Sequence, residues 1–257
     1  MHRRQVKVGC AGWSIPSAHA HLFGPGQSML ARYATRFHVV EINSSFYRPH
    51  QIKTYQRWAA DVPRTFQFSV KLPQTISHGL ALRGAGPLLA QFLPQAEGLG
   101  HKLAGFLLQL PPSLVLDARV AAAFFRSFRH RSDAALVCEP RHPSWFTARA
   151  EDLLERHQVS RIAADPARVP AAATPGAEAA WPYWRWHGAP RMYYSDYSDQ
   201  ALQALAGPVQ TYRQSQRPPW VIFDNTAHGF AVANAASLQN LLSAKTKPAS
   251  QQEHSHA

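Results

Sequence analysis

Short apolar runs recur along the chain, and most of them are bounded by glycine, proline or charged residues. Short runs of this kind are typical of buried parallel strands, because both faces of such strands are covered. The pattern predicts eight strands, over residues 6–12, 38–42, 66–71, 105–109, 135–139, 160–164, 183–187 and 220–223.

Segments with apolar residues at helical spacing alternate with these runs. They predict helices over residues 27–37, 51–60, 87–98, 117–129, 144–157, 198–214 and 231–243. Asp117 and Ser144 are the expected N-caps of two of these helices, and Pro94 is expected to kink or split a third. Residues 165–182 contain several prolines and a glycine, so the sixth crossover is expected to be irregular.

Strands that alternate with helices indicate an α/β protein with a parallel sheet. Eight strands in a chain of 257 residues favour a single TIM-type (β/α)8 barrel over a doubly wound open sheet. No G-x-G-x-x-G sequence follows a predicted strand and no P-loop is present, which further weakens the nucleotide-binding open sheet. We expect one barrel domain over residues 1–243 and a disordered polar tail over residues 244–257.

Most predicted strands end at a residue that is able to do chemistry, and the ends of parallel barrel strands meet at one place. We call this edge, formed by the C-terminal ends of the strands, the mouth. The catalytic candidates at the mouth are Glu41, Glu139 and His187, and the substrate-binding candidates are Asn43, Tyr47, Lys71, Gln109, Arg141, Trp145, Asp165, Arg185 and Asn225.

Glu41 and Glu139 are the expected general acid and base, because neighbouring carboxylates in a semi-enclosed site have pKa values that are pushed apart. Lys71, Arg141 and Arg185 are expected to bind an anionic group of the substrate, the two arginines in bidentate fashion. The competing interpretation is that these charged residues form structural ion pairs that plug the end of the barrel. A ligand site is favoured for the set as a whole, because burying so many polar groups without a function is costly.

Three further candidates have two interpretations each. His187 is either a proton shuttle or a structural histidine that is hydrogen-bonded to a backbone carbonyl. Tyr47 and Trp145 follow predicted strands, so they either stack on bases or sugar rings of a ligand or pack within their loops.

The formal net charge is +12, from 27 lysines and arginines against 15 aspartates and glutamates. This excess favours anionic partners, namely a small anionic molecule or nucleic acid. The basic residues are spread along the chain without a dense basic arm, so solubility alone is the alternative explanation. No cofactor is predicted, and a divalent metal is the less favoured alternative, because three cations would share the mouth with its carboxylates.

Cys10 and Cys138 both lie inside apolar runs, and we expect reduced, buried thiols in a cytoplasmic protein. No apolar stretch approaches the roughly 20 residues of a membrane span, and no signal peptide is visible before the first predicted strand. No membrane association is therefore expected, and the oligomeric state stays open.

Seven blocks of sequence resemble, in order, those of one known family. They are GCAGW (residues 9–13), EINSSFY (41–47), FSVKLP (68–73), LQLPP (108–112), EPRHPSW (139–145), RWHG (185–188) and FDN (223–225). The resemblance is to the YecE-like family, a domain of unknown function numbered seventy-two, and it covers roughly residues 6–242. It implies a β/α barrel but supplies no established reaction. The pair of asparagines that usually follows the last strand in the family reads Asp224-Asn225 here.

The residues themselves favour an enzyme that acts on a phosphate- or carboxylate-bearing substrate, because acid, base and cation-binding groups converge. Nucleic acid is one branch of that hypothesis. The alternatives are a non-catalytic protein that binds an anionic ligand at the same mouth, and a structural nucleic-acid-binding protein whose affinity depends steeply on salt.

Overall fold

The computed structural model describes residues 4–176 and 179–244 of the chain. The strands are short, as expected for runs that are covered on both faces. They are β1 (Lys7–Cys10), β2 (Val39–Ile42), β3 (Gln67–Lys71), β4 (Leu103–Gln109), β5 (Ala135–Glu139), β6 (Val159–Arg161), β7 (Ala163–Asp165), β8 (Tyr183–Trp186) and β9 (Trp220–Phe223). Every predicted strand therefore corresponds to at least one observed strand, with ends that differ by at most two residues.

The strands form two parallel sheets, in the orders β1-β9-β8-β7 and β2-β3-β4-β5-β6. The sheets meet at two places. β1 approaches β2 where Ala11 bridges Glu41 and the Gly12 amide donates to the Glu41 carbonyl over 2.8 Å. β6 and β7 follow one another along the chain with Ile162 between them. The protein is thus an α/β fold with two parallel sheets, whereas the sequence predicted a single sheet of eight strands.

The predicted sixth strand is divided because its two halves pair with different neighbours. β6 pairs with β5, and the Ile162 amide still donates to the Cys138 carbonyl over 2.9 Å. From Ala163 onward the chain pairs with β8 instead. The connection from β7 to β8 contains the short 3-10 helix η5 (Pro170–Ala173) and no α-helix among its described residues.

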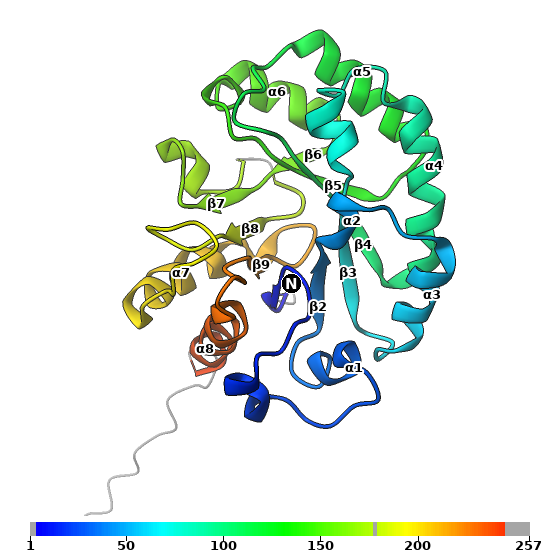
Figure 1. Cartoon of the computed structure of the whole chain (residues 1–257). Coiled ribbons are helices and arrows are strands. Elements are labelled where there is room, and N and C mark those ends of the chain that lie inside the picture. Colours follow the sequence, from blue (N-terminus) through cyan, green and yellow to red (C-terminus); the bar gives the residue numbers. More distant parts are fainter. Residues whose placement is uncertain (1–3, 177–178, 245–257) are drawn as a thin grey trace, which may run out of the picture.

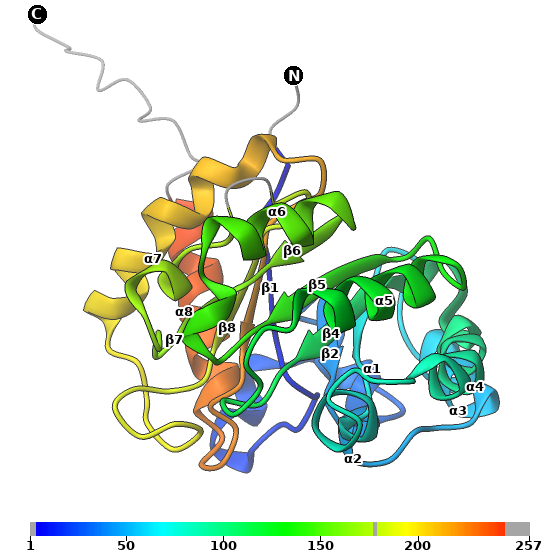
Figure 2. The same ribbon diagram turned by 90° about the horizontal axis from the view of Figure 1, so that it is seen from above.

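Helices lie along the outside of both sheets, with α3 to α6 beside the five-stranded sheet and α7 and α8 beside the other (Figures 1 and 2). The α-helices are α1 (Met29–Tyr33), α2 (Ser44–Tyr47), α3 (Ile52–Ala60), α4 (Gly86–Ala96), α5 (Ala118–Arg129), α6 (Ala148–Arg156), α7 (Asp199–Thr211) and α8 (Phe230–Ala244). The shorter turns are η1 (Ser17–Leu22), η2 (Thr75–Gly79), η3 (Glu97–Lys102), η4 (Pro143–Trp145) and η6 (Tyr212–Gln214).

Two details of the helix prediction are wrong. Pro94 lies inside α4 without dividing it, because a missing N–H removes one hydrogen bond while Leu89, Phe92 and Leu93 stay buried on one face of the helix. The helix predicted to start at Ser144 starts after Thr147, whose hydroxyl accepts from the Ala150 amide. The Ser144 hydroxyl instead accepts from the Leu116 amide, over 2.8 Å.

α8 extends to Ala244, the first residue of the tail predicted over residues 244–257. The rest of that tail lies outside the described residues. Among the described residues, no helix is both long enough and apolar enough to cross a membrane. Cys10 and Cys138 are buried, unpaired thiols, and burial raises the pKa of both.

Side chains alternate along each strand, and the alternation separates an inner core from an outer one. On β9, Trp220 and Ile222 belong to a small cluster with Tyr183 and Trp181, whereas Val221 and Phe223 belong to the large cluster that contains the helices' apolar residues. Since Arg185 is two residues beyond Tyr183, it shares the inner face. Inward-facing polar side chains at the C-terminal ends of the strands, Arg185 among them, therefore lie next to this inner core.

Candidate functional site

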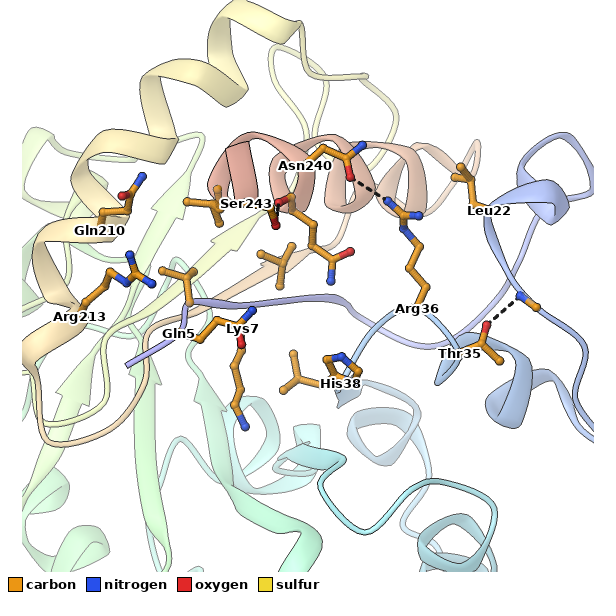
Figure 3. A pocket seen from close by; sticks show the side chains of 16 residues that line it. Gln5, Lys7, Leu22, Thr35, Arg36, His38, Gln210, Arg213, Asn240 and Ser243 are labelled. Carbon is orange, nitrogen blue, oxygen red and sulfur yellow. Dashed lines mark hydrogen bonds between the residues drawn. The ribbon is translucent and has the colours of Figure 1, made fainter. Parts of the chain in front are cut away.

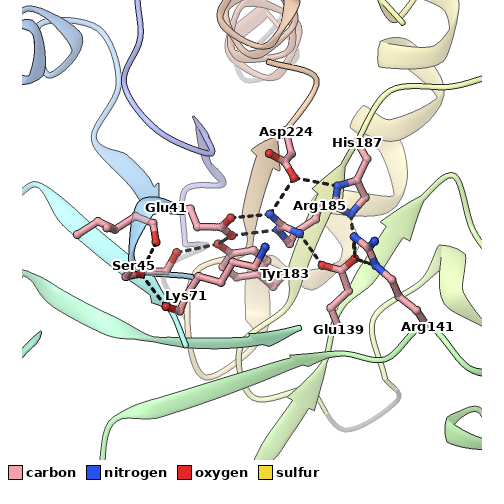
Figure 4. Close-up of polar contacts among 11 residues, drawn as sticks. Glu41, Ser45, Lys71, Glu139, Arg141, Tyr183, Arg185, His187 and Asp224 are labelled. Carbon is pink, nitrogen blue, oxygen red and sulfur yellow. Dashed lines mark hydrogen bonds and ion pairs between the residues drawn. The ribbon is translucent and has the colours of Figure 1, made fainter. Parts of the chain in front are cut away.

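Arg185 is the centre of a buried polar network at the mouth (Figure 4). Its guanidinium makes four hydrogen bonds to carboxylates: two to Glu41, at 3.1 Å from Nε and 2.7 Å from Nη2, one to Glu139 at 2.6 Å, and one to Asp224 at 2.9 Å. Burial alone would lower the pKa of Arg185, but the three carboxylates outweigh burial and hold this pKa well above its ordinary value. The three acids come from β2, β5 and the end of β9, so one side chain ties together strands from both sheets.

Glu41 is fully buried and both of its oxygens are occupied. Beyond Arg185, its Oε2 accepts from the Tyr183 hydroxyl over 2.9 Å, and that hydroxyl is 2.8 Å from the Ser69 hydroxyl. Burial and the charge of Glu41 raise the pKa of Tyr183 well above its ordinary value, so Tyr183 stays protonated as a donor. Glu41 has no exposed surface and therefore holds Arg185 in place instead of facing a ligand.

Glu139 is bound by three cationic side chains. Its Oε1 accepts from Arg141 Nε over 3.0 Å and lies 2.9 Å from His187 Nε2, while its Oε2 accepts from Arg185. Burial raises the pKa of Glu139, but Arg141, His187 and Arg185 outweigh burial and hold this pKa well below its ordinary range. Glu139 is therefore held as an ionised acceptor by these three side chains.

His187 lies between two carboxylates. Its Nε2 faces Glu139, and its Nδ1 is 3.0 Å from Asp224 Oδ2. Two carboxylates are both satisfied when each ring nitrogen carries a proton. Gly188 follows with a φ of +94°, and a Cβ there would meet the Ser195 carbonyl at 2.9 Å. Glycine thus lets the chain turn directly after His187, and the imidazole is held by side chains, not by the backbone carbonyl that the structural interpretation of His187 assumed.

Lys71 differs from the other cations of the network because it has no carboxylate partner. Its Nζ lies 3.9 Å from the centre of the Phe46 ring, and the side chain makes no ion pair in the described part of the chain. Burial, followed by repulsion from Arg185, lowers the pKa of Lys71 to about 8. The residue as a whole is 4% exposed. The amine is therefore poised to change its charge near neutral pH.

Arg141 and His78 form an outer layer with Lys71. The Arg141 side chain is 11% exposed and forms an ion pair with Glu139, at 2.9 Å from Nη2, and it also interacts with Tyr193. His78 is on η2, which directly follows β3, and its ring contacts Phe46 with 5.1 Å between ring centres. Burial and the charges of Lys71 and Arg141 lower the pKa of His78. An anion bound beside Lys71 and Arg141 would be stabilised by their charges.

Asn43, Gln109 and Asn225 also lie at the C-terminal ends of strands. Gln109 is opposite Glu139 in the β4–β5 register and is buried. Asn225 donates to Asn234 Oδ1 over 2.8 Å and to the Ser195 carbonyl over 3.0 Å. The buried Oδ1 atoms of Asn43 and Asn225 have no hydrogen-bond partner among the described residues. Both amides therefore have an acceptor available for a donor on a ligand.

The remaining candidates are separate from the network. Trp145 is 1% exposed and its indole N–H donates to the Leu114 carbonyl, so neither ring face is open to a base or sugar. Tyr47 is on α2 and is 68% exposed. Asp165 accepts from the Tyr197 hydroxyl over 2.6 Å. Of these three, the structure leaves Tyr47 the most accessible to a ligand.

The geometry also corrects the expected role of Arg185 and adds residues that the sequence analysis missed. Arg185 has no exposed surface and its guanidinium is occupied by three acids, so it does not bind an anionic substrate. Asp224, which was not among the site candidates from the sequence, is a full member of the network. Tyr183 could have been found by strand alternation, since it lies two residues before Arg185. His78 had no such signal, because it is in a turn beyond the strand end.

Residues 4–176 and 179–244 contain no group of three or more histidine, cysteine, aspartate or glutamate side chains placed to hold a metal ion. The carboxylates of the network instead surround a guanidinium. A cavity of about 810 Å³ lies at the other end of the strands, where β1 and β2 begin, and Figure 3 shows the side chains that line it. Lys7, Arg36 and Arg213 are among them, but none of the predicted site residues is.

Parallel strands whose C-terminal ends carry one connected polar network define an α/β protein with a site at the mouth. The sequence profile of the family described as "Protein of unknown function DUF72" matches residues 7–256. The chain belongs to this family, which confirms the resemblance seen in its seven sequence blocks.

Relatives and solved structures agree with this assignment. The chain is 29% identical to UPF0759 protein YecE of Escherichia coli K12 over 173 residues, which are 65% of this chain and 61% of YecE. It is 29% identical to UPF0759 protein YunF of Bacillus subtilis over 154 residues, or 55% of this chain and 52% of YunF. The chain thus matches less than two thirds of the length of these relatives.

Two solved DUF72 proteins share the fold. The protein of Enterococcus faecalis V583 superimposes with a TM-score of 0.78 at 22% identity, covering 93% of this chain and 96% of that one. The protein of Thermotoga maritima MSB8 has a TM-score of 0.78 at 24% identity, covering 93% of this chain and all of that one. At identities of 22% and 24%, this similarity establishes a shared fold and nothing further.

Proposed function

We propose that this protein is an enzyme that binds a small phosphate- or carboxylate-bearing substrate at the mouth and moves a proton on it. In this proposal the two sheets work as one (β/α)8 barrel around the network, and the protein is cytoplasmic. Sites at the C-terminal ends of parallel strands are the rule for enzymes of such architecture. That rule is a fold-level analogy, so the argument depends on the residues.

The observation that carries the proposal is the contrast between Arg185 and Lys71. Arg185 is saturated by three acids, whereas Lys71 is a buried cation without a carboxylate partner. An unpaired buried charge is costly, and proteins keep such groups where function requires them. With Arg141 and His78 beside it, Lys71 supports a site that is completed by an anion.

The roles follow from exposure and charge. Arg141 is the anchor for the anionic group, because it is the more exposed arginine of the network and a guanidinium binds phosphate or carboxylate through two donors. Lys71 carries the proton, since a group with a pKa of about 8 is an efficient acid or base near neutral pH. Glu41, Glu139, Asp224 and Arg185 form the rigid layer beneath, which positions Lys71 and Arg141 through their charges.

The test is stabilisation by an anion. Sulfate or phosphate that binds the folded protein raises the melting temperature by mass action. We expect this shift to be lost in Arg141→Gln and reduced in Lys71→Met, and to persist in the control Arg83→Gln, which alters an exposed ion pair with Asp117. Equal shifts in all three variants would overturn the proposed anion site. Arg141→Gln also removes a partner of Glu139 and so changes the network itself. Among the described residues, Lys71→Met removes no partner of a carboxylate, so a reduced shift in that variant reports on the anion site.

Nucleic acid is the second candidate partner, and the net charge of +12 favours it. If duplex DNA is the ligand, the logarithm of the affinity falls with the logarithm of salt concentration, with a slope of about −0.9 for each phosphate contacted. Weak binding of DNA and RNA at low salt, together with a sulfate-dependent thermal shift, would leave small anions as the partners.

A binding protein without catalysis is the third candidate, and the saturation of Glu41 and Glu139 favours it, because neither acid is free to react. The two functions differ in the fate of the ligand. An enzyme converts a metabolite that stabilises the protein, whereas a binding protein returns it unchanged. Prolonged incubation followed by mass spectrometry of the recovered ligand separates them.

A further inference from the structure

We infer that the Lys71 amine forms a covalent imine with a carbonyl carbon, and that the substrates of the mouth are therefore aldehydes or ketones that also carry a carboxylate or phosphate. This inference depends on the proposed function for its anion site but goes beyond proton transfer. It follows from the surroundings of the Lys71 side chain, from the charge of Arg185 that acts on it, and from a comparison with the other lysines.

The contacts of Lys71 fix the position of its side chain but do not occupy the lone pair of its neutral amine. The backbone carbonyl of Lys71 accepts from the Ser45 hydroxyl over 2.6 Å, which fixes the end of β3 beside α2. The same short helix supplies Phe46, whose ring lies 3.9 Å from Nζ. A cation–π contact attracts the ammonium but takes none of its lone pair after deprotonation. The neutral amine is consequently free to attack an electrophile.

Other lysines in the described part of the chain are held differently. The Lys102 amine donates to two backbone carbonyls, those of Ala59 and Val62, at 2.5 and 2.6 Å. The Lys7 amine donates to Gln67 Oε1 over 2.5 Å. Lys53 is exposed on α3. Among these four, Lys71 combines burial, freedom from acceptors and a position at the mouth.

The charge state of Lys71 fits a nucleophile. With its pKa lowered to about 8, roughly a quarter of the molecules carry a neutral amine at pH 7.5, against about one in a thousand for an exposed lysine. A lysine that is desolvated or placed next to another cationic group is activated in this way in imine-forming enzymes. For Lys71, both conditions hold, because burial and Arg185 act together.

The anion requirement comes from Arg141, which lies near Lys71, because the charges of both side chains lower the pKa of His78. An anionic group bound to Arg141 would bring the rest of a small molecule to Lys71. A carbonyl next to, or a few bonds from, that anionic group is therefore the electrophile that the site fits.

The covalent step balances without a further reactant. The neutral amine attacks the carbonyl carbon, a C–N bond forms, and the C=O π electrons move to oxygen. The nitrogen then releases one proton and the oxygen takes up one proton, which gives a neutral carbinolamine. The nitrogen lone pair then expels the hydroxyl group as water after a second protonation. Starting from the ammonium form, the products are an iminium ion and one water molecule, so no oxidant or reductant is needed.

Reductive trapping tests the inference. The protein is incubated at pH 7.5 with glyoxylate, a small aldehyde that carries a carboxylate, and with cyanoborohydride, which reduces an imine to a stable secondary amine. Peptide mapping by mass spectrometry then compares the labelling of Lys71 with that of the exposed Lys53 in the same sample. We expect Lys71 to be labelled at least tenfold faster, the preference to fall in Arg141→Gln, and added sulfate to suppress it.

Two controls keep the outcomes distinct. Lys71→Arg retains the charge but has no amine, so labelling at position 71 must disappear while Lys53 is labelled as before. Formaldehyde, a neutral aldehyde, reports whether the Lys71 amine is reachable at all. Labelling of Lys71 by formaldehyde and not by glyoxylate would overturn the anionic carbonyl class. Absence of labelling by both would overturn the imine, while a sulfate shift that depends on Arg141 would still support the proposed function.

Discussion

Arg185 donates to both carboxylate oxygens of Glu41, over 3.1 Å from Nε and 2.7 Å from Nη2, and neither residue has any exposed surface. This bidentate pair joins β8 of one sheet to β2 of the other. Side chains thus link the two sheets at the mouth, in addition to the backbone contact between β1 and β2. The pair stabilises the network that positions Lys71 and Arg141 for a ligand.

The first prediction concerns the stability that Arg185 supplies. Arg185→Met leaves Glu41, Glu139 and Asp224 buried without their shared cation, and we expect the free energy of unfolding to fall by about 3–5 kcal/mol. Urea denaturation followed by circular dichroism measures this change. Arg83→Met removes an ion pair that is largely exposed, so its cost should stay below about 1 kcal/mol. Similar losses in the two variants would show that the network is not structural.

The second prediction concerns Lys71 in alkaline solution. Its pKa is about 8 in the folded protein and about 10.4 when unfolded, so between these values the unfolded chain binds the extra proton. The free energy of unfolding should therefore rise with pH from about 8 to 10, relative to Lys71→Met, by up to about 3 kcal/mol. Parallel denaturation curves of the two proteins across this range measure the difference. A constant difference would mean that Lys71 has an ordinary pKa.

The third prediction concerns how the stability of the folded protein depends on pH in acidic solution. The pKa of Glu139 is held well below its ordinary value, so the ionised form stabilises the folded state above about pH 4.3, the unfolded value. This contribution is lost as the pH falls toward the folded pKa. Glu139→Gln should be less stable than wild type at pH 7, by about 3 kcal/mol, and should lose less stability on acidification.

Thermal melts from pH 7 to pH 3 test this expectation. Glu155→Gln is the matched control, because Glu155 is an exposed glutamate on α6. Its pH profile should follow that of the wild type. If Glu139→Gln also follows the wild type, then Glu139 is not held by its three cations, and a role in proton transfer becomes open again.

Much of the fold was predictable because buried strands and amphipathic helices have distinct periods. β5 and β9 were predicted to the residue, and the N-cap at Asp117 is confirmed. The division between β6 and β7 was not, because residues 160–164 read as one continuous strand. The change of partner at Ile162 depends on how the sheets curve, which a local pattern does not record.

The location of the candidate site was predictable from the strand ends, but the division of roles within it was not. Sequence places Glu41, Glu139 and Arg185 at the same edge, yet it gives no distances. The distances decide that Arg185 pairs with the acids and that Lys71 does not. Trp145 shows the same limit, since a loop aromatic and a buried one look alike until the partner of the indole N–H is known.

The fourth prediction concerns the anion itself, and it tests the central claim most directly. Crystals soaked in selenate and measured at the selenium absorption edge reveal the anion by anomalous scattering. We predict a peak within hydrogen-bonding distance of both Lys71 Nζ and the Arg141 guanidinium, and loss of this peak in Arg141→Gln crystals. Selenate peaks at surface sites alone, with none between Lys71 and Arg141, would contradict the account.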